Sequence, residues 1–236
     1  MEYFIVLGLL MLIIGVGYFI FNVQLKEMKN AGKNKKLDEL TSRFPENKEI
    51  CKIILKKLNN EKVKIKENKD NKTSLYIAIS DTIFIANIKD TYTRIQTIAH
   101  ECLHSVQSRR LLLFNFIYSN IYIIYFVLSI ILTILGVFKD AKLQIIILSI
   151  LGFFYYVIRS YLETDAMTKA RYLAKEYMLE YIDINPICNK EEIEGIISEY
   201  DRINKLGIPA INYMLMVNCI VKVILFIIIV IIKNLL

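Results

Sequence analysis

The stretch Leu111–Phe138, LLLFNFIYSNIYIIYFVLSIILTILGVF, contains no charged side chain in 28 residues. A helix that crosses the hydrocarbon layer of a bilayer needs about 20 predominantly apolar residues. Three further apolar runs near or above this length occur at 4–21, 143–158 and 208–232. The sequence therefore predicts a mainly α-helical integral membrane protein with four transmembrane helices.

The composition predicts an aqueous part beside the membrane part. The chain is 55% hydrophobic and 22% charged, a mixture that a single soluble domain rarely shows. The polar residues gather in two segments, and the expected organisation follows from their positions. It comprises an N-terminal transmembrane anchor (1–21), a cytoplasmic α+β region (22–110), a transmembrane hairpin (111–160), a cytoplasmic helical region (161–207) and a C-terminal transmembrane helix (208–236).

Basic residues predict which side of the membrane each segment occupies, because Lys and Arg near transmembrane helices are retained in the cytoplasm. None precedes the first apolar run, and five lysines follow it within 26–36. We therefore expect a multi-pass protein of the cell membrane, with both termini and the 139–142 turn outside. The four cysteines show no paired spacing, and a cytoplasmic location would keep them reduced.

The cytoplasmic segment 22–110 is basic, with 19 Lys and Arg against 11 Asp and Glu. Its lysines are scattered among acidic residues, without aromatic interleaving or a recognisable nucleic-acid module. The pattern favours contact with anionic lipid headgroups, at about 1 kcal/mol for each nearby lysine. The bilayer is thus an expected partner, and nucleic acid is not.

Within 22–110 the spacing of apolar residues changes twice. Residues 46–59 have helical spacing. Apolar residues then alternate in 63–67 and in 74–87, with a break at Ser80-Asp81, which predicts a small antiparallel sheet. Helical spacing returns from Tyr92 to Arg110, with Asp90 or Thr91 as the expected N-cap.

Two helices are expected in the second cytoplasmic segment. One covers 160–184. The other begins after Asn189, which is the expected N-cap, with Glu192 as its reciprocal partner in a capping box.

The helix expected at 92–110 carries the only two histidines of the chain, in the pattern H-E-C-L-H at 100–104. His100 and His104 lie four residues apart, so they project from one helical face and can converge on one metal ion. Glu101 lies about 100° around the helix from His100, beside such an ion rather than on it. This is the arrangement of zinc peptidases, in which the glutamate takes a proton from water at the metal. The alternative is a chance match of three fixed positions on a surface helix.

A catalytic zinc site uses three protein ligands and keeps one position for water. Cys102 projects from the opposite side of the helix and cannot join the histidines. The chain leaves the inner membrane surface shortly after His104, and Glu163 is the first acidic residue after its return. Glu163 is therefore the expected third ligand. Asp165 would face away from it and is expected to support the ligands rather than bind the metal.

Two segments carry a resemblance to a known family. TIAHECLHSVQ (97–107) is similar to the A-H-E-x-G-H-A-x-Q core of the bacterial membrane-bound neutral zinc metallopeptidases, the YugP-like group, and LETDAMTKA (162–170) is similar to their E-x-D-A-x-x-x-A segment. The arrangement of anchor, inner domain, motif, membrane hairpin and second motif also matches, over nearly the whole chain. Leu103 departs from the usual glycine, which concerns local packing more than catalysis.

The resemblance implies a small zincin-like cytoplasmic domain with a gluzincin-type site. It implies one Zn²⁺ per chain, bound by His100, His104 and Glu163, with Glu101 as the catalytic base. The family also resembles other gluzincins in using an edge strand near the zinc helix to bind peptide by β-addition. The run 81–87 is the candidate strand, and an ordinary core strand is an equal alternative.

The sequence thus predicts a membrane-embedded zinc-dependent metalloendopeptidase that cleaves membrane-associated or misfolded polypeptides at the cytoplasmic membrane surface. An intramembrane protease of the site-2 type is disfavoured, because the polar flanks KDTYTR and SVQSRR would lie in lipid. A non-enzymatic four-helix scaffold or transporter subunit with a structural zinc site is the alternative. Lys222, within the last apolar run, favours it, although a snorkelling lysine or a helix packed against protein is simpler. An oxyanion donor is also expected near Arg159, Tyr161, Arg171 or Tyr172.

Overall fold

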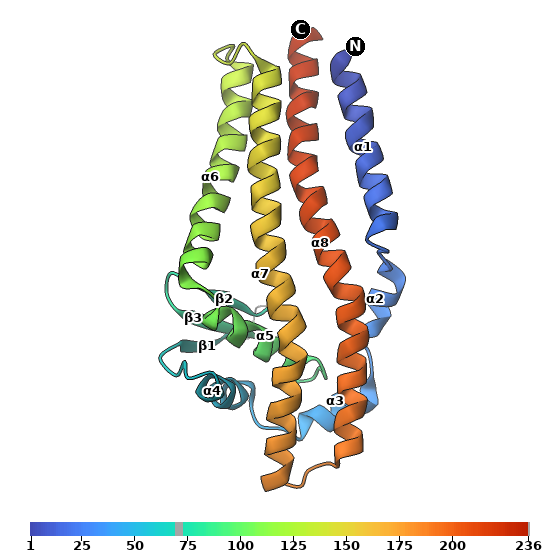
Figure 1. Ribbon diagram of the computed structural model, residues 1–236, viewed down its shortest axis with the longest axis vertical. Helices are drawn as coiled ribbons and strands as arrows, with labels where there is room; N and C mark the ends of the chain where they lie inside the picture. The colour runs from blue at the N-terminus through green and yellow to red at the C-terminus, as the bar shows by residue number, and fades with distance from the viewer. Residues whose placement is uncertain (69–72, 236) are drawn as a thin grey trace. The chain divides into compact units, whose positions relative to one another are not determined.

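The structure, a computed structural model, describes residues 1–68 and 73–235 (Figure 1). Contacts divide the chain into two compact units. The four-helix unit comprises Met1–Val23, Phe114–Tyr161 and Pro209–Leu236, and the mixed unit comprises Gln24–Leu113 and Leu162–Ile208. In chain order the elements are α1 (Glu2–Ile20), α2 (Leu25–Ala31), α3 (Lys35–Ser42), α4 (Asn47–Lys57), β1 (Lys64–Asn68), β2 (Leu75–Ile77), β3 (Thr82–Ala86), α5 (Arg94–Val106), α6 (Arg109–Ile134), α7 (Ala141–Ile184) and α8 (Lys190–Leu235).

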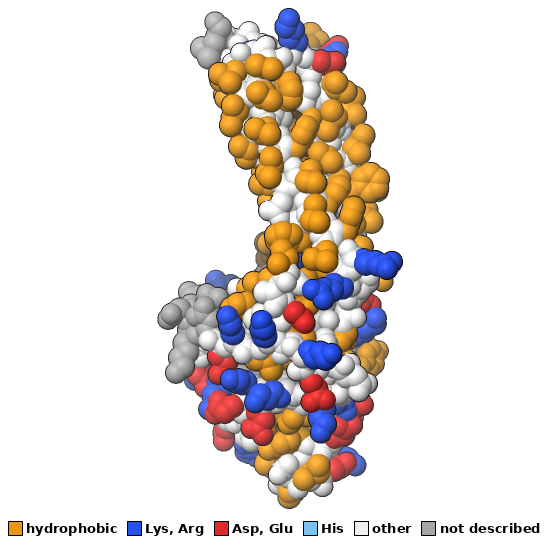
Figure 2. Space-filling model, turned by 90° about the vertical axis from the view of Figure 1, so that its left-hand side faces the viewer, with side chains coloured by type: hydrophobic (Ala, Val, Ile, Leu, Met, Phe, Trp, Pro, Cys, Tyr) orange, Lys and Arg blue, Asp and Glu red, His pale blue; other side chains and the backbone are white. Residues whose placement is uncertain are grey.

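Among the described residues, α1, α6, α7 and α8 are long and apolar enough to cross a membrane. Figure 2 shows hydrophobic side chains gathered over the four-helix unit and charged side chains over the mixed unit. An apolar surface of this extent suits a lipid environment, where the backbone groups are satisfied inside each helix. The prediction of a mainly helical chain with four long apolar helices is therefore confirmed.

The two chain ends and the turn between α6 and α7 lie at one end of the four-helix unit (Figure 1). Glu2 and Lys142 form an ion pair there, with 2.6 Å between Oε2 and Nζ. The three segments thus lie at the same end of the four-helix unit (Figure 1), while the side of the membrane that they occupy stays a prediction.

Gly152 of α7 allows close packing inside the four-helix unit. A Cβ at this position would lie 2.8 Å from the Tyr122 hydroxyl oxygen and 3.2 Å from the Cys219 Cβ. Gly152→Ala would force the neighbouring helices to shift, at a cost of about 1–3 kcal/mol. We expect this variant to unfold at a lower temperature in detergent than the wild type. Gly15→Ala is the control, because a Cβ at Gly15 meets nothing within 4 Å; equal loss of stability in both variants would contradict this packing.

The mixed unit is built around one hydrophobic core. The side chains of Ile95, Ile98 and Cys102 on α5 are fully buried in it, together with Ile54 of α4 and Tyr200 of α8. Burying one large aliphatic side chain contributes about 1.5–3 kcal/mol. The core therefore fixes the rotation of α5 and leaves one of its faces for polar side chains.

The sheet differs from the predicted antiparallel one. Its order is β1-β3-β2, with β1 parallel to β3 and β2 antiparallel to β3. Asp81, whose φ is 46°, makes the tight turn between β2 and β3, as the break in the sequence pattern indicated. The parallel pair arises because the chain crosses over between β1 and β3. Since β3 is the central of the three described strands, the prediction of 81–87 as a substrate-binding edge strand is wrong.

The helix that carries both histidines is shorter than predicted. It begins at Arg94 rather than after Asp90 or Thr91, because the Tyr92 side chain is buried and its hydroxyl donates a hydrogen bond to the Ala31 carbonyl oxygen. It ends at Val106, where Gln107 adopts extended backbone angles (φ −62°, ψ 160°), and α6 then starts at Arg109. The expected continuation to Arg110 is therefore wrong.

The two helices expected after the hairpin are present as parts of longer helices, α7 and α8. The predicted capping box is confirmed at the start of α8. The Asn189 side chain accepts from the Glu192 backbone N–H at 2.8 Å, and the Glu192 carboxylate accepts from the Asn189 backbone N–H at 2.9 Å. Pro209 lies inside α8 without ending it.

Candidate metal centre

The candidate site lies wholly within the mixed unit, between α5 and the segment of α7 that follows Leu162. His100 and His104 project from the α5 face that is not used for the core, and their rings meet edge to face with centroids 4.5 Å apart. The two Nε2 atoms are 3.0 Å apart. The side chains are mostly buried, with 19% and 10% of their surface exposed. The spacing of four residues therefore produces the convergence that the sequence predicted.

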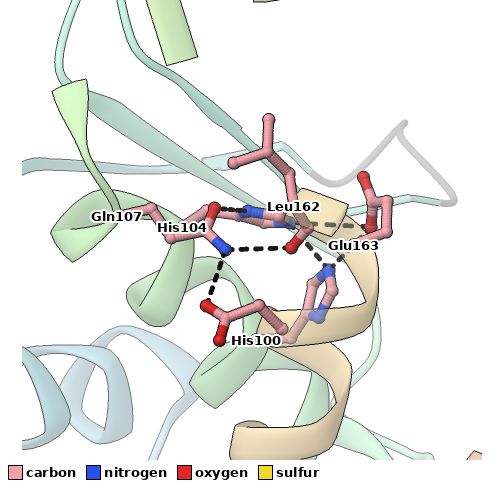
Figure 3. Close-up of polar contacts among 6 residues, drawn as sticks. His100, His104, Gln107, Leu162 and Glu163 are labelled. Carbon is pink, nitrogen blue, oxygen red and sulfur yellow. Dashed lines mark hydrogen bonds and ion pairs between the residues drawn. The ribbon is translucent and has the colours of Figure 1, made fainter. Parts of the chain in front are cut away.

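Glu163 of α7 completes the cluster (Figure 3). Its Oε2 lies 3.4 Å from His100 Nε2 and 3.6 Å from His104 Nε2. Among the described residues, these three form the group of His, Cys, Asp and Glu side chains that could hold a metal ion. Residues about 60 positions apart in the chain thus bring two imidazole nitrogens and a carboxylate oxygen to one point.

The separations between the three candidate ligand atoms fit a tetrahedrally coordinated ion. Zinc binds His nitrogen and carboxylate oxygen at about 2.0–2.1 Å, so neighbouring ligands of a tetrahedron lie about 3.3–3.4 Å apart. The three observed separations, 3.0, 3.4 and 3.6 Å, lie close to this value. The donor set of two imidazoles and one carboxylate also suits zinc. With three ligands, a tetrahedral ion keeps a fourth position for water or substrate.

Gln107 sets the tautomer of His104. Its side-chain Nε2 donates to the Leu162 carbonyl oxygen at 2.9 Å and to Asp165 Oδ2 at 3.1 Å, which fixes the orientation of the amide (Figure 3). Its Oε1 therefore faces His104 Nδ1, at 2.8 Å, and can only accept. His104 Nδ1 must carry the proton, so the Nε2 lone pair is free to bind a metal.

The break at the end of α5 makes this contact possible. Gln107 lies three residues after His104, and its extended backbone turns the chain away from the helix axis at this position. Asp165, which supports Gln107, also pairs with Lys169 at 2.5 Å and is outside the metal-binding group. The sequence predicts a supporting role for Asp165 but not for Gln107, because the role of Gln107 depends on a helix end at Val106.

Burial and the neighbouring Glu163 shift the pKa of His104 in opposite directions. Burial lowers the pKa of His104, but its hydrogen bond and charge interaction with Glu163 outweigh burial and leave that pKa raised. A proton therefore competes with a metal for this site, and metal binding would release it.

Glu101 is buried beside the cluster, with 6% of the residue exposed. Burial raises the pKa of its carboxyl above the ordinary value, against the lowering effects of His100 and His104. The backbone N–H of Tyr76 in β2 donates a hydrogen bond to this carboxyl and orients it. A buried carboxyl with a raised pKa beside a metal-binding group is typical of a general base. The contact with Tyr76 was missed because it depends on sheet order.

Cys102, Arg171 and Tyr172 lie away from the cluster within the mixed unit. Cys102 is buried on the far side of α5, with its Sγ 3.6 Å from Cys51 Sγ, as its position in the motif indicated. Arg171 pairs with Asp201 and covers the Tyr172 ring. Eight residues of helix, about 12 Å, separate Arg171 from Glu163, so the structure does not bring it or Tyr172 to the cluster. Arg159 and Tyr161 belong to the four-helix unit.

We expect Gln107→Leu to weaken zinc binding by about 10–100-fold, as loss of a group that orients a ligating histidine typically does. Gln107→Glu should recover only part of the affinity, because a carboxylate accepts from His104 Nδ1–H but cannot donate to the Leu162 carbonyl oxygen or to Asp165. The measurement is zinc binding to the detergent-purified protein in a competitive chelator titration. Equal affinities in wild type and Gln107→Leu would show that Gln107 does not orient His104.

Comparison of the chain with protein-family models, curated proteins and solved structures found no match. The structural basis for a function is therefore the geometry of His100, His104 and Glu163, with Glu101 beside them.

Proposed function

We propose that the chain is a zinc-dependent metalloendopeptidase anchored in the cell membrane, with its site in the mixed unit facing the cytoplasm. The observation that carries the proposal is the convergence of His100 Nε2, His104 Nε2 and Glu163 Oε2 within 4.8 Å of one another, with the buried Glu101 carboxyl next to the group. The resemblance of the two sequence segments to the YugP-like metallopeptidases supports the same function.

Each residue has a distinct role in this proposal. His100, His104 and Glu163 would hold one Zn²⁺, and Gln107 keeps His104 in the tautomer that can bind it. Bound zinc supplies a Lewis acid that lowers the pKa of water and polarises the scissile carbonyl. Glu101 takes the proton from the attacking water as general base and delivers it to the leaving amine nitrogen as general acid. Its raised pKa helps it to hold that proton between the two steps.

The substrate we propose is a polypeptide that is membrane-associated or misfolded. The four-helix unit has the length and apolar surface to keep the enzyme in the bilayer, and the mixed unit connects to it at four points along the chain. An enzyme held in this way meets substrates that are themselves at the membrane.

The proposal is tested with protein purified in detergent. We expect about one zinc per chain by elemental analysis, and cleavage of an unfolded protein such as reduced casein. Chelation of the metal should abolish cleavage, and added Zn²⁺ should restore it. A protein that binds zinc stoichiometrically but cleaves no unfolded substrate would instead favour a structural zinc site.

A further inference from the structure

Lys222 is an ionisable residue near the middle of a membrane-crossing segment. It lies in the part of α8 that belongs to the four-helix unit. At 1.5 Å per residue, about 20 Å of helix separate it from Pro209 and about 16 Å from Lys233. The hydrocarbon layer is about 30 Å thick, so either interface is far for a lysine side chain.

The contacts of Lys222 within the unit are all with neutral groups. Its Nζ donates to the Asn218 side-chain oxygen and lies 3.4 Å from the Asn218 backbone oxygen, one turn earlier on α8. The ammonium also lies 5.2 Å from the ring centroid of Tyr122 on α6. Among the described residues no carboxylate pairs with it. The residue is only half-buried, so the ammonium remains accessible from the lipid side.

Within the described part of the four-helix unit, no acidic side chain lies where it could neutralise Lys222. The four-helix unit contains two acidic residues, Glu2 and Asp140, and both lie at its terminal end, where Glu2 pairs with Lys142. A second copy of the chain would add only its own Glu2 and Asp140, again at the terminal end of the four-helix unit and not beside Lys222. Lipid phosphates lie at the interfaces rather than in the hydrocarbon layer.

A charge at this depth is costly unless it is paired, and intramembrane ionisable residues commonly mark a functional contact. The neighbouring surface also fits a helical partner. Exposed apolar side chains of Met214, Val221 and Leu225 lie on the same helical face as Asn218 and Lys222, at spacings of three, four and seven residues. Along the helix, Met214 precedes and Leu225 follows the Asn218 amide and the Lys222 ammonium. A partner helix could therefore make apolar contacts before and after the polar pair.

We propose that this face of α8 binds a transmembrane helix of another polypeptide, one that carries an Asp or Glu near the middle of its apolar segment. The partner carboxylate pairs with Lys222, and Asn218 holds the ammonium in place. The pairing removes the cost of an isolated charge in lipid, and it selects partners by the presence and depth of one acidic residue.

The test uses three synthetic transmembrane peptides of leucine and alanine, with Glu, Gln or Leu at the central position. Their association with the full-length protein is measured by energy transfer in phosphatidylcholine vesicles. We expect the Glu peptide to bind the wild type at least tenfold more tightly than the Leu or Gln peptide. Lys222→Met should abolish this preference, while Lys222→Arg should retain it.

Lys233→Met is the matched control. Lys233 lies at the end of α8 and donates to the Thr133 carbonyl oxygen, so this variant should keep the full preference. Equal binding of the three peptides to the wild type, or an unchanged preference in Lys222→Met, would overturn the proposal. So would self-association of the chain, or binding to anionic lipid, that depends on Lys222 in the absence of peptide. If Lys222→Met does not fold, the peptide series with wild type, Lys222→Arg and Lys233→Met still decides the question.

Discussion

Replacing Glu101 by glutamine is expected to leave zinc binding intact and to reduce kcat/KM for an unfolded protein substrate by about 10³-fold, within the range of general acid–base catalysis. The metal should remain because His100, His104 and Glu163 form the metal-binding group, and Glu101 lies outside it. The amide of glutamine fills the same volume and can still accept the hydrogen bond from the Tyr76 backbone N–H. It cannot take a proton from water at neutral pH, so the chemical step should fail.

Two measurements on the same preparation decide this prediction. Elemental analysis gives zinc per chain, and cleavage of casein gives the rate. Full activity in Glu101→Gln would rule out Glu101 as the base, whatever the zinc content. Loss of both zinc and activity would show that Glu101 holds the site together rather than transferring a proton. Glu199→Gln is a suitable control, because Glu199 is acidic but lies on α8 and pairs with Arg202 rather than with the cluster.

The predictions from sequence succeeded where periodicity within one segment decides the structure. Four long apolar runs are enough to predict four helices, and the spacing of His100 and His104 is enough to predict their convergence on a helix. The capping box at Asn189 was predicted for the same reason, since its two hydrogen bonds join residues three apart. The proximity of Glu163 was predicted from the return of the chain after the hairpin rather than from its local pattern.

The predictions failed where contacts distant in sequence override local preference. The sheet order depends on a crossover that places β3 between β1 and β2, which alternation of apolar residues does not reveal. The end of α5 at Val106 places Gln107 against His104, and its amide is fixed by Leu162 and Asp165 from another helix. Helical spacing continued to Arg110, so the sequence pattern gave no signal for this break.

Replacing Glu163 by alanine is expected to remove zinc almost completely. With two histidines alone, two of the four coordination positions of a tetrahedral ion are left to water. Losing a group that only supports a ligand weakens metal binding by about 10–100-fold, and losing a ligand should weaken zinc binding further. Asp165→Asn is the matched control on the same helix. Its side chain can still accept from Gln107 Nε2–H, so most of the zinc should stay. The measurement is zinc per chain after equilibration with a chelator that buffers free Zn²⁺.

The structure also predicts that no nearby carboxylate will replace Glu163. Asp165 lies two residues further along α7, outside the metal-binding group, and is held by Lys169 and Gln107. Glu101 is buried and oriented by the Tyr76 backbone. Moving either carboxyl onto the ion would break these contacts and leave buried polar groups without partners, at about 1–3 kcal/mol each. Retention of zinc in Glu163→Ala, together with its loss in Asp165→Asn, would therefore mean that the third ligand is Asp165 and that α7 is rotated relative to α5.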